Sequence, residues 1–155
     1  MTNIKIVSYK TRLDNLFKKV EALPEDFELQ SHWAKYLCVL VSGFLETSVR
    51  AIYSQYAHKR AAPNVANYVT RRLDSFQNPN MTKIINLTNS FNPGWGDSLR
   101  EKTEGELKNA IDSICANRNL IAHGRDSGIT YARINDWYQD AIEVVELIEK
   151  QCEDG

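Results

Sequence analysis

The chain has 155 residues, which is the size of one ordinary domain and is enough to bury a continuous core. Hydrophobic residues make up 43% and charged residues 25% of the composition, so neither a disordered nor a fibrous protein is indicated. The net charge of -1 excludes a global basic field, and any binding of nucleic acid must therefore use a local cluster of cations. We expect a single domain over residues 1–155.

Three cysteines, Cys38, Cys115 and Cys152, lie far apart and show no CxxC or Cys/His spacing of the kind that binds zinc. They are typical of reduced thiols, and we expect no metal site and no cofactor. The N-terminus lacks the uninterrupted apolar run of a signal peptide, and we expect no segment to be long enough to span a membrane. These features predict a cytoplasmic protein.

Apolar residues recur every three or four positions along most of the chain, which is the pattern of one-sided helices. The segments with this pattern are 3–22, 25–58, 63–76, 81–91, 104–122 and 131–151. Between two of them, Asn92–Gly96 is dense in turn residues, and we expect a connector there. No alternating strand pattern is found. The sequence predicts an all-α fold, an up-and-down helical bundle of four main helices plus one or two short helices.

A basic segment, His58–Lys59–Arg60, separates the long predicted helix from the next one. Its side chains could contact phosphate groups or only solvate a helix end. Short runs of charge are usually solvated surface, which favours the second interpretation.

An arginine interrupts the apolar stripe of the segment 104–122. With about 100° of rotation per residue, the stripe places Arg118 in line with the residues that should face the core. These residues are Leu107, Ile111, Ile114 and Ile121. Burying an unpaired guanidinium costs several kcal/mol, so Arg118 should meet a carboxylate, a set of carbonyl groups or a water-filled pocket.

Glu46 is the best candidate for the partner of Arg118, because it lies off the apolar stripe of the long helix. Two other interpretations stay open. A pair between Arg118 and Glu46 could serve only to fix the register of two helices. Glu46 and Arg50 could instead form an ordinary i,i+4 pair on a solvated surface.

His123 lies at the end of the same predicted helix, just before Gly124, which is a natural residue to stop it. The helix dipole there favours the imidazolium form, so His123 could transfer a proton or could merely cap carbonyl groups. A second face of this helix is small and apolar at its centre, which indicates contact with a second copy or a partner. It consists of Asp112, Ala116, Asn119, Leu120 and His123.

Arg118 and His123 are about 140° apart on an ideal helix. The two side chains therefore cannot point the same way. Either the last turn unwinds, or the site is completed by a second chain across a two-fold interface.

The hexamer Arg118–His123 matches the R-x4-H signature of the HEPN superfamily, including the polar Asn119 after the arginine. The long helix with Leu45–Glu46 and the segment Gly128–Arg133 also resemble the RiboL-PSP group of HEPN domains from bacterial conflict systems. The likeness extends over most of the chain. It implies a helical bundle that homodimerises and brings two copies of the motif into one cleft, which cuts RNA without metal.

The resemblance also implies a role for each residue of the motif. Arg118 would bind the scissile phosphate, His123 would act as general acid or base for attack by the ribose 2′-OH, and Asn119 would position the phosphate or the histidine. Glu46, with Arg50 beside it, would support the site by orienting Arg118. The product would carry a 2′,3′-cyclic phosphate, and the protein would be a defence or toxin-antitoxin effector with a possible antitoxin or regulatory partner.

One position departs from the family pattern. HEPN toxins that are silenced by nucleotidylation carry a tyrosine two residues after the histidine, and this position is Arg125 here. The tyrosine that this mode of control uses is therefore absent, and Arg125 could instead add a contact to RNA. Two other interpretations remain: a HEPN-type dimerisation or RNA-binding module without catalysis, and a structural bundle in which the motif occurs by chance.

Overall fold

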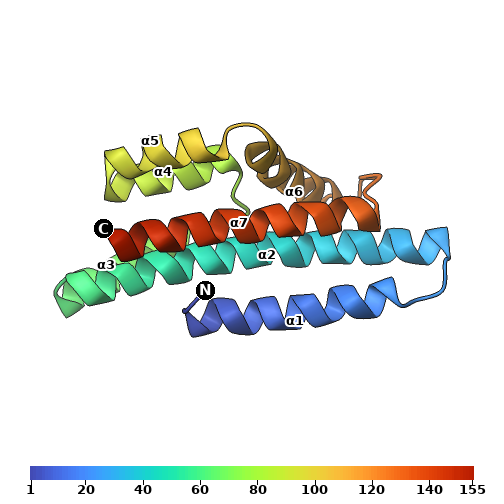
Figure 1. The fold of residues 1–155 in the computed structure, drawn as a ribbon, viewed down its shortest axis with the longest axis horizontal. Coiled ribbons are helices and arrows are strands. Elements are labelled where there is room, and N and C mark those ends of the chain that lie inside the picture. Colours follow the sequence, from blue (N-terminus) through green and yellow to red (C-terminus); the bar gives the residue numbers. More distant parts are fainter.

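Helix α2, Phe27–Arg60, is the axis of the fold in the computed structural model, which describes residues 1–155 (Figure 1). Asp26 starts it by accepting hydrogen bonds from the backbone N–H groups of Glu28 and Leu29. Helices α1, α3, α6 and α7 all pack against α2. The length of α2 thus lets distant parts of the chain share one core.

The structure consists of seven helices and no strands, which confirms the predicted all-α class. Beside α2 they are α1 (Ile4–Glu21), α3 (Pro63–Leu73), α4 (Met81–Phe91), α5 (Pro93–Thr103), α6 (Glu106–Ala122) and α7 (Tyr131–Asp154). Four of the helices are long, as predicted, but three are short instead of one or two.

The additional short helix is α5, and the prediction of a connector at Asn92–Gly96 was wrong. Asn92 ends α4 and also caps α5, because its side chain accepts a hydrogen bond from the N–H of Gly94. Pro93 occupies the first position of α5, where its missing N–H and fixed φ are tolerated. Asparagine and proline occur both in loops and at the first positions of helices, and here Asn92 and Pro93 begin a helix.

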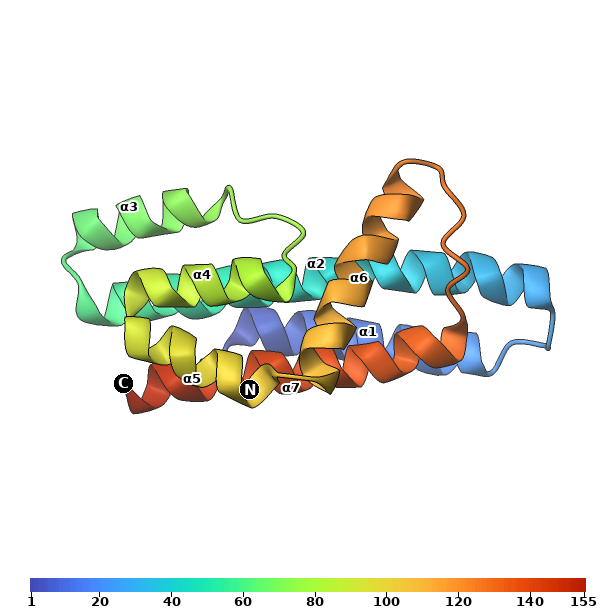
Figure 2. The ribbon, with the colours of Figure 1, turned by 90° about the horizontal axis from the view of Figure 1, so that it is seen from above.

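The long helices differ in direction (Figures 1 and 2). Helix α1 runs antiparallel to α2, whereas α7 lies beside α2 and runs the same way. Helix α6 crosses both of them, and its C-terminal end projects beyond α2 (Figure 2). The R-x4-H motif lies on this projecting end.

Helices α1, α2 and α7 share an aromatic cluster in the core. The rings of Phe17 and Tyr138 stack at 4.7 Å between centroids, and Phe44 meets Tyr138 edge-on at 5.8 Å. The buried hydroxyl of Tyr138 donates a hydrogen bond of 2.7 Å to the carboxylate of Asp14. Burial and this carboxylate both raise the pKa of Tyr138, so the hydroxyl stays protonated.

Helix α2 is long and apolar enough to cross a membrane, by length and composition alone. The expectation that no segment reaches such a length was therefore wrong. However, 61% of its most apolar window is buried inside the fold, as in the core helix of a globular protein.

Candidate active site at the end of helix α6

A glycine terminates α6, as predicted. Gly124 has a φ of 68°, and its N–H donates to the carbonyl of Ile121, while the N–H of Arg125 donates to the carbonyl of Leu120 at 2.8 Å. This pair of hydrogen bonds is a Schellman motif, in which a residue with positive φ lets the chain satisfy the last carbonyl groups of a helix. His123 occupies the C-cap position, and the side chains of His123 and Arg125 are exposed.

Arg118 does not reach the core, which corrects the prediction from the apolar stripe. Ile111 and Ile114 are buried, whereas Arg118 and Ile121, further along the same stripe, are only half-buried. The physical reason is the crossing of α6 over α2, after which the helix has left the core. The guanidinium of Arg118 forms no ion pair or hydrogen bond with another residue of the chain, so its donors are free.

The expected contact between Arg118 and Glu46 was also wrong. One carboxylate oxygen of Glu46 lies 3.2 Å from the guanidinium of Arg50, and the other accepts a hydrogen bond of 2.8 Å from the backbone N–H of Asn78. Arg50 also donates to the carbonyl groups of Asp74 and Phe76. Glu46 and Arg50 therefore hold the loop between α3 and α4 against α2.

Asn78, in that loop, connects α2 to the motif and was missed in the sequence. Its amide NH₂ group donates a hydrogen bond of 2.7 Å to the side-chain oxygen of Asn119, and its own side-chain oxygen accepts one of 3.0 Å from Ser42. The backbone carbonyl of Asn78 accepts from the thiol of Cys115 at 3.3 Å. Glu46 thus supports the motif through Asn78 and Asn119.

The thiol of Cys115 is kept protonated for this contact. Burial raises the pKa of Cys115, and the nearby charge of Asp112 raises it further, while Lys83 and Arg118 oppose the rise. A protonated thiol can donate to the carbonyl of Asn78, which a thiolate cannot do.

The predicted second face of α6 is partly occupied within the chain. Asp112 accepts hydrogen bonds from the N–H of Met81 at 2.9 Å and from Lys108 at 3.1 Å, and Asn119 is held by Asn78. Ala116 and His123 remain exposed. Only the C-terminal part of this face is available to a second copy.

The last turn of α6 does not unwind, because the helix is continuous to Ala122. Arg118 and His123 of one chain therefore lie on different sides of the helix. An unwound last turn therefore does not bring Arg118 and His123 of one chain together.

A family model for RiboL-PSP-HEPN matches residues 5–154, nearly the whole chain. The chain belongs to the RiboL-PSP-HEPN family. HEPN domains are all-α, in agreement with the seven helices, and they are associated with ribonuclease or RNA-binding activity. Comparisons with curated proteins and with solved structures found no match.

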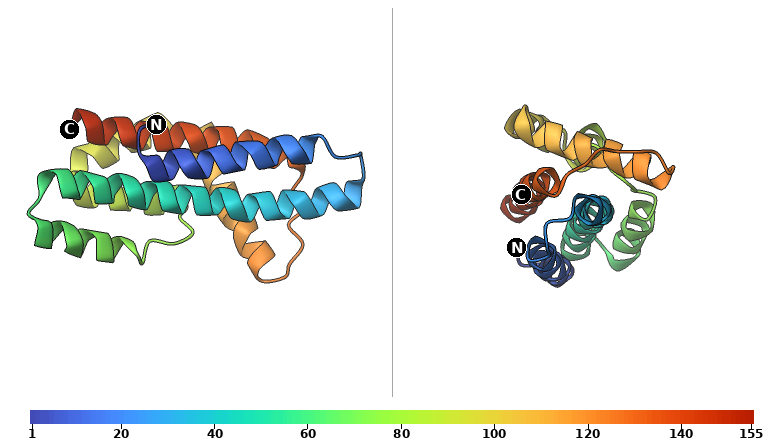
Figure 3. Two further views of the ribbon diagram at one scale, coloured as in Figure 1. Left: turned by 90° about the horizontal axis from the view of Figure 1, so that it is seen from below. Right: turned by 90° about the vertical axis from the view of Figure 1, so that its right-hand side faces the viewer.

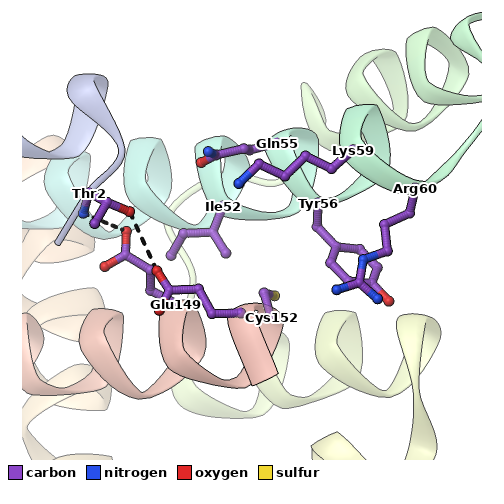
Figure 4. A pocket seen from close by; sticks show the side chains of 9 residues that line it. Thr2, Ile52, Gln55, Tyr56, Lys59, Arg60, Glu149 and Cys152 are labelled. Carbon is purple, nitrogen blue, oxygen red and sulfur yellow. Dashed lines mark hydrogen bonds between the residues drawn. The ribbon is translucent and has the colours of Figure 1, made fainter. Parts of the chain in front are cut away.

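A pocket at the far end of this HEPN domain contains none of the motif residues. It lies between the C-terminal parts of α2 and α7, and Lys59, Arg60, Glu149 and Glu153 are among its lining residues (Figure 4). Two of these groups already have partners, since Glu149 pairs with the N-terminal amine at 3.4 Å and Arg60 donates to the carbonyl of Gly155. The active site is therefore not assigned to this pocket.

No group of three or more His, Cys, Asp or Glu side chains in the HEPN domain is placed so as to hold a metal ion. The groups at the end of α6 that could act on RNA are a guanidinium, an amide and an imidazole. This set suits the binding of a phosphate and the transfer of a proton.

Proposed function

We propose that this HEPN domain is a metal-independent endoribonuclease whose active site is the end of α6. Arg118 binds the scissile phosphate, Asn119 positions it, and His123 transfers a proton. Arg125, exposed just beyond the histidine, adds a contact to the RNA backbone. Glu46 and Arg50 support the site by holding the loop that carries Asn78.

The free guanidinium of Arg118 is the observation that carries this proposal. An arginine that served only to fix the register of two helices would be paired with a carboxylate, and Arg118 has no such partner. A guanidinium also offers several N–H donors in a fork that matches the oxygens of a phosphate, on which negative charge develops during cleavage.

The chemistry needs no other reactant than the RNA itself. A histidine removes the proton of the ribose 2′-OH, and the 2′ oxygen forms a bond to phosphorus as the bond to the 5′ oxygen breaks. A protonated histidine then supplies a proton to that 5′ oxygen. The products are a 2′,3′-cyclic phosphate and a 5′-OH end.

Arg118 and a His123 that takes up and then returns the proton must meet at one phosphate, which one straight helix end cannot provide. We therefore assign the working site to a homodimer in which the ends of two α6 helices face each other. The exposed Ala116 and His123 lie on the part of α6 that is free for this contact. Such a nuclease would act on RNA in the cytoplasm as a defence or toxin-antitoxin effector, under the control of a partner protein.

Cleavage of mixed RNA in the presence of EDTA tests the proposal. We expect the wild-type protein to leave 2′,3′-cyclic phosphate ends. Arg118→Ala and His123→Ala should each lose activity by about 100-fold or more, because electrostatic stabilisation of the phosphate and general acid–base catalysis each contribute that much. The control is Arg133→Ala, an exposed arginine in the first turn of α7. Equal cleavage by the wild type and both motif variants would remove the assignment of the site.

The side chain of His123 favours a second candidate function. It forms no hydrogen bond that would orient its ring, whereas catalytic histidines are usually held by a partner. A HEPN-type dimerisation or RNA-binding module without catalysis is the function that fits this observation. Binding of RNA without cleavage by the purified dimer would support this second function.

A further inference from the structure

Charge is divided unevenly along the chain. Residues 47–96 contain six cations and only one acid, Asp74, a net charge of +5, whereas the rest contains 13 cations and 19 acids, a net charge of -6. The six cations are Arg50, Lys59, Arg60, Arg71, Arg72 and Lys83. The overall charge of -1 therefore hides a basic segment, which consists of the C-terminal half of α2, the whole of α3 and α4, and the start of α5.

Helix α3 uses only a narrow side to pack on α2. Ala66 and Leu73 are buried, and the hydroxyl of Thr70 lies 2.7 Å from that of Ser54. The residues of the opposite side are exposed, and their side chains form no hydrogen bond or ion pair with another element. We call this side the outer face of α3; it consists of Asn64, Val65, Tyr68, Arg71 and Arg72, all exposed.

The outer face combines an aromatic ring with two cations. Tyr68 is 64% exposed, and Arg71 and Arg72 follow it by three and four positions, so the three side chains share one side of the helix. Neither arginine forms an ion pair. Arg50 and Arg100, in contrast, are paired with Glu46 and Asp97 on their own helices. Both the charge and the ring of the outer face are thus available to a ligand.

Helix α3 lies on the same side of the molecule as the R-x4-H motif. In two views α3 and the C-terminal end of α6 both project beyond α2 in the same direction (Figures 2 and 3). The loop between α3 and α4 joins the two through the contact of Asn78 with Asn119. A ligand that extends along this side could contact both helices.

We propose that the outer face of α3 binds single-stranded RNA and holds the strand that enters the site at the end of α6. This inference rests on the proposed function. Tyr68 stacks on a base, and Arg71 and Arg72 bind the flanking phosphates. A ring on a convex helix can stack only on an unpaired base, and a basic surface with an exposed aromatic ring is the usual means of binding single strands.

Binding of an RNA that cannot be cleaved tests this surface without any need for catalysis. The probe is a fluorescent 2′-O-methyl oligonucleotide of about 15 nucleotides, near the upper site size of a single-strand-binding module. Its affinity is measured by anisotropy at several salt concentrations. For Arg71→Gln/Arg72→Gln we expect weaker binding and a salt slope of log K that falls by about 1.4, because each phosphate contact to a single strand contributes about 0.7.

A matched control is available on α1. Lys18→Gln/Lys19→Gln also removes two adjacent exposed cations from the last turn of a helix, and it should leave the salt slope unchanged. Tyr68→Leu should weaken binding about five-fold or more, whereas Tyr68→Phe should bind as the wild type does, because stacking needs a ring. The exposure of Tyr68 makes these changes compatible with folding, which circular dichroism checks.

Cleavage separates this inference from the proposed nuclease. With a long RNA, Arg71→Gln/Arg72→Gln should raise KM and leave kcat unchanged, and with a dinucleotide it should change neither. If the oligonucleotide binds through α3 but no RNA is cleaved, the proposed nuclease activity is contradicted, while the proposed role of the outer face of α3 in binding RNA is retained. Oligonucleotide binding that is absent from the wild type, or unaffected by both the arginine and the Tyr68→Leu changes, would overturn the surface.

Discussion

At the scale of single residues, Asn78 is the point through which the candidate site is attached to the fold. Its φ of 41° lies in the left-handed region, which asparagine tolerates better than most side chains. Its amide also accepts from Ser42 and donates to Asn119. With the oxygen of Asn119 so engaged, the NH₂ group of Asn119 is left as the donor that can face a phosphate.

Replacement of Asn78 should slow the cleavage of RNA while the protein keeps its fold. Asn78→Gly keeps the backbone conformation but removes two hydrogen bonds, and it should lower the free energy of unfolding by about 1–2 kcal/mol in urea denaturation. Asn78→Asp keeps the acceptor for Ser42 and offers Asn119 no donor. We expect both variants to cleave RNA about five-fold more slowly or worse. A folded Asn78→Asp protein with wild-type kinetics would contradict this role.

The buried thiol of Cys38 makes stability depend on pH in alkali. Burial is the main cause that raises its pKa from 9.0 to about 12. The unfolded chain therefore loses this proton above pH 9 while the folded protein keeps it, so the thiol's contribution to stability is complete below pH 9 and falls as pH rises towards 12. At pH 10 the loss is about 1.4 kcal/mol.

Urea denaturation of the wild type and Cys38→Ala at pH 7.5 and pH 10 measures this effect. The variant is expected to be less stable at pH 7.5, because the substitution removes a buried group, and the difference should narrow at pH 10. A difference that stays constant between the two pH values would show that the thiol of Cys38 ionises in the folded protein as readily as in the unfolded chain.

The sequence located the residues of the motif but not their contacts. The residues Arg118, Asn119 and His123 stand out by type and spacing, and the family match agrees with the resemblance that they carry. The partner of Glu46 could not be foreseen, because it depends on a loop residue 32 positions away. The local signal of that loop in the sequence was the tract Asn78–Pro79–Asn80, whose residue types favour a turn.

At the scale of elements, the end of α6 shows which features of a helix can be predicted from the spacing of its apolar residues. The bounds of the long helices follow from apolar spacing and capping residues, which are local properties. The angle at which α6 crosses α2 is set by packing of side chains from several helices. For this reason the stripe of α6 was traced correctly, but the point where it leaves the core was not.

Gly124 should matter through its backbone alone. An added Cβ would meet nothing within 4 Å, but the φ of 68° is unfavourable for alanine. Gly124→Ala should therefore lower the free energy of unfolding by about 1 kcal/mol and slow cleavage by displacing His123. Asparagine tolerates this φ, so Gly124→Asn should keep most of the stability and most of the cleavage rate that Gly124→Ala loses. Thermal melting and cleavage rates of the two variants check this, and an Ala variant as stable as the wild type would argue against the cap.

At the scale of the whole molecule, a site shared between two chains predicts complementation. If Arg118 of one chain works with His123 of the other, a dimer of Arg118→Ala with His123→Ala keeps one intact site. After denaturation and refolding of an equal mixture, half of the dimers are mixed, so about a quarter of wild-type activity should return. A mixture as inactive as either variant would show that each phosphate needs residues from one chain only or from all four positions.

The uneven division of charge also gives the molecule a negative and a positive side, and therefore an electric dipole moment. Seven acids and two cations lie on α7, and the end-on view places α7 and α3 on opposite sides of α2 (Figure 3). The pKa of Asp140 reflects the negative charge on this side, because it is raised first by burial and then by the nearby carboxylates of Glu106, Glu143 and Asp136.

A particle with such a dipole rotates in the field of any highly charged surface until the opposite pole faces it. Ion-exchange chromatography at pH 7.5 should show this orientation as retention of the protein on both an anion-exchange and a cation-exchange resin. A protein with a pI of about 6.3 is otherwise expected to bind only to the anion-exchange resin. Arg71→Gln/Arg72→Gln should shorten retention on the cation resin only. The same rotation would turn α3 and the end of α6 towards an approaching RNA before any contact is made.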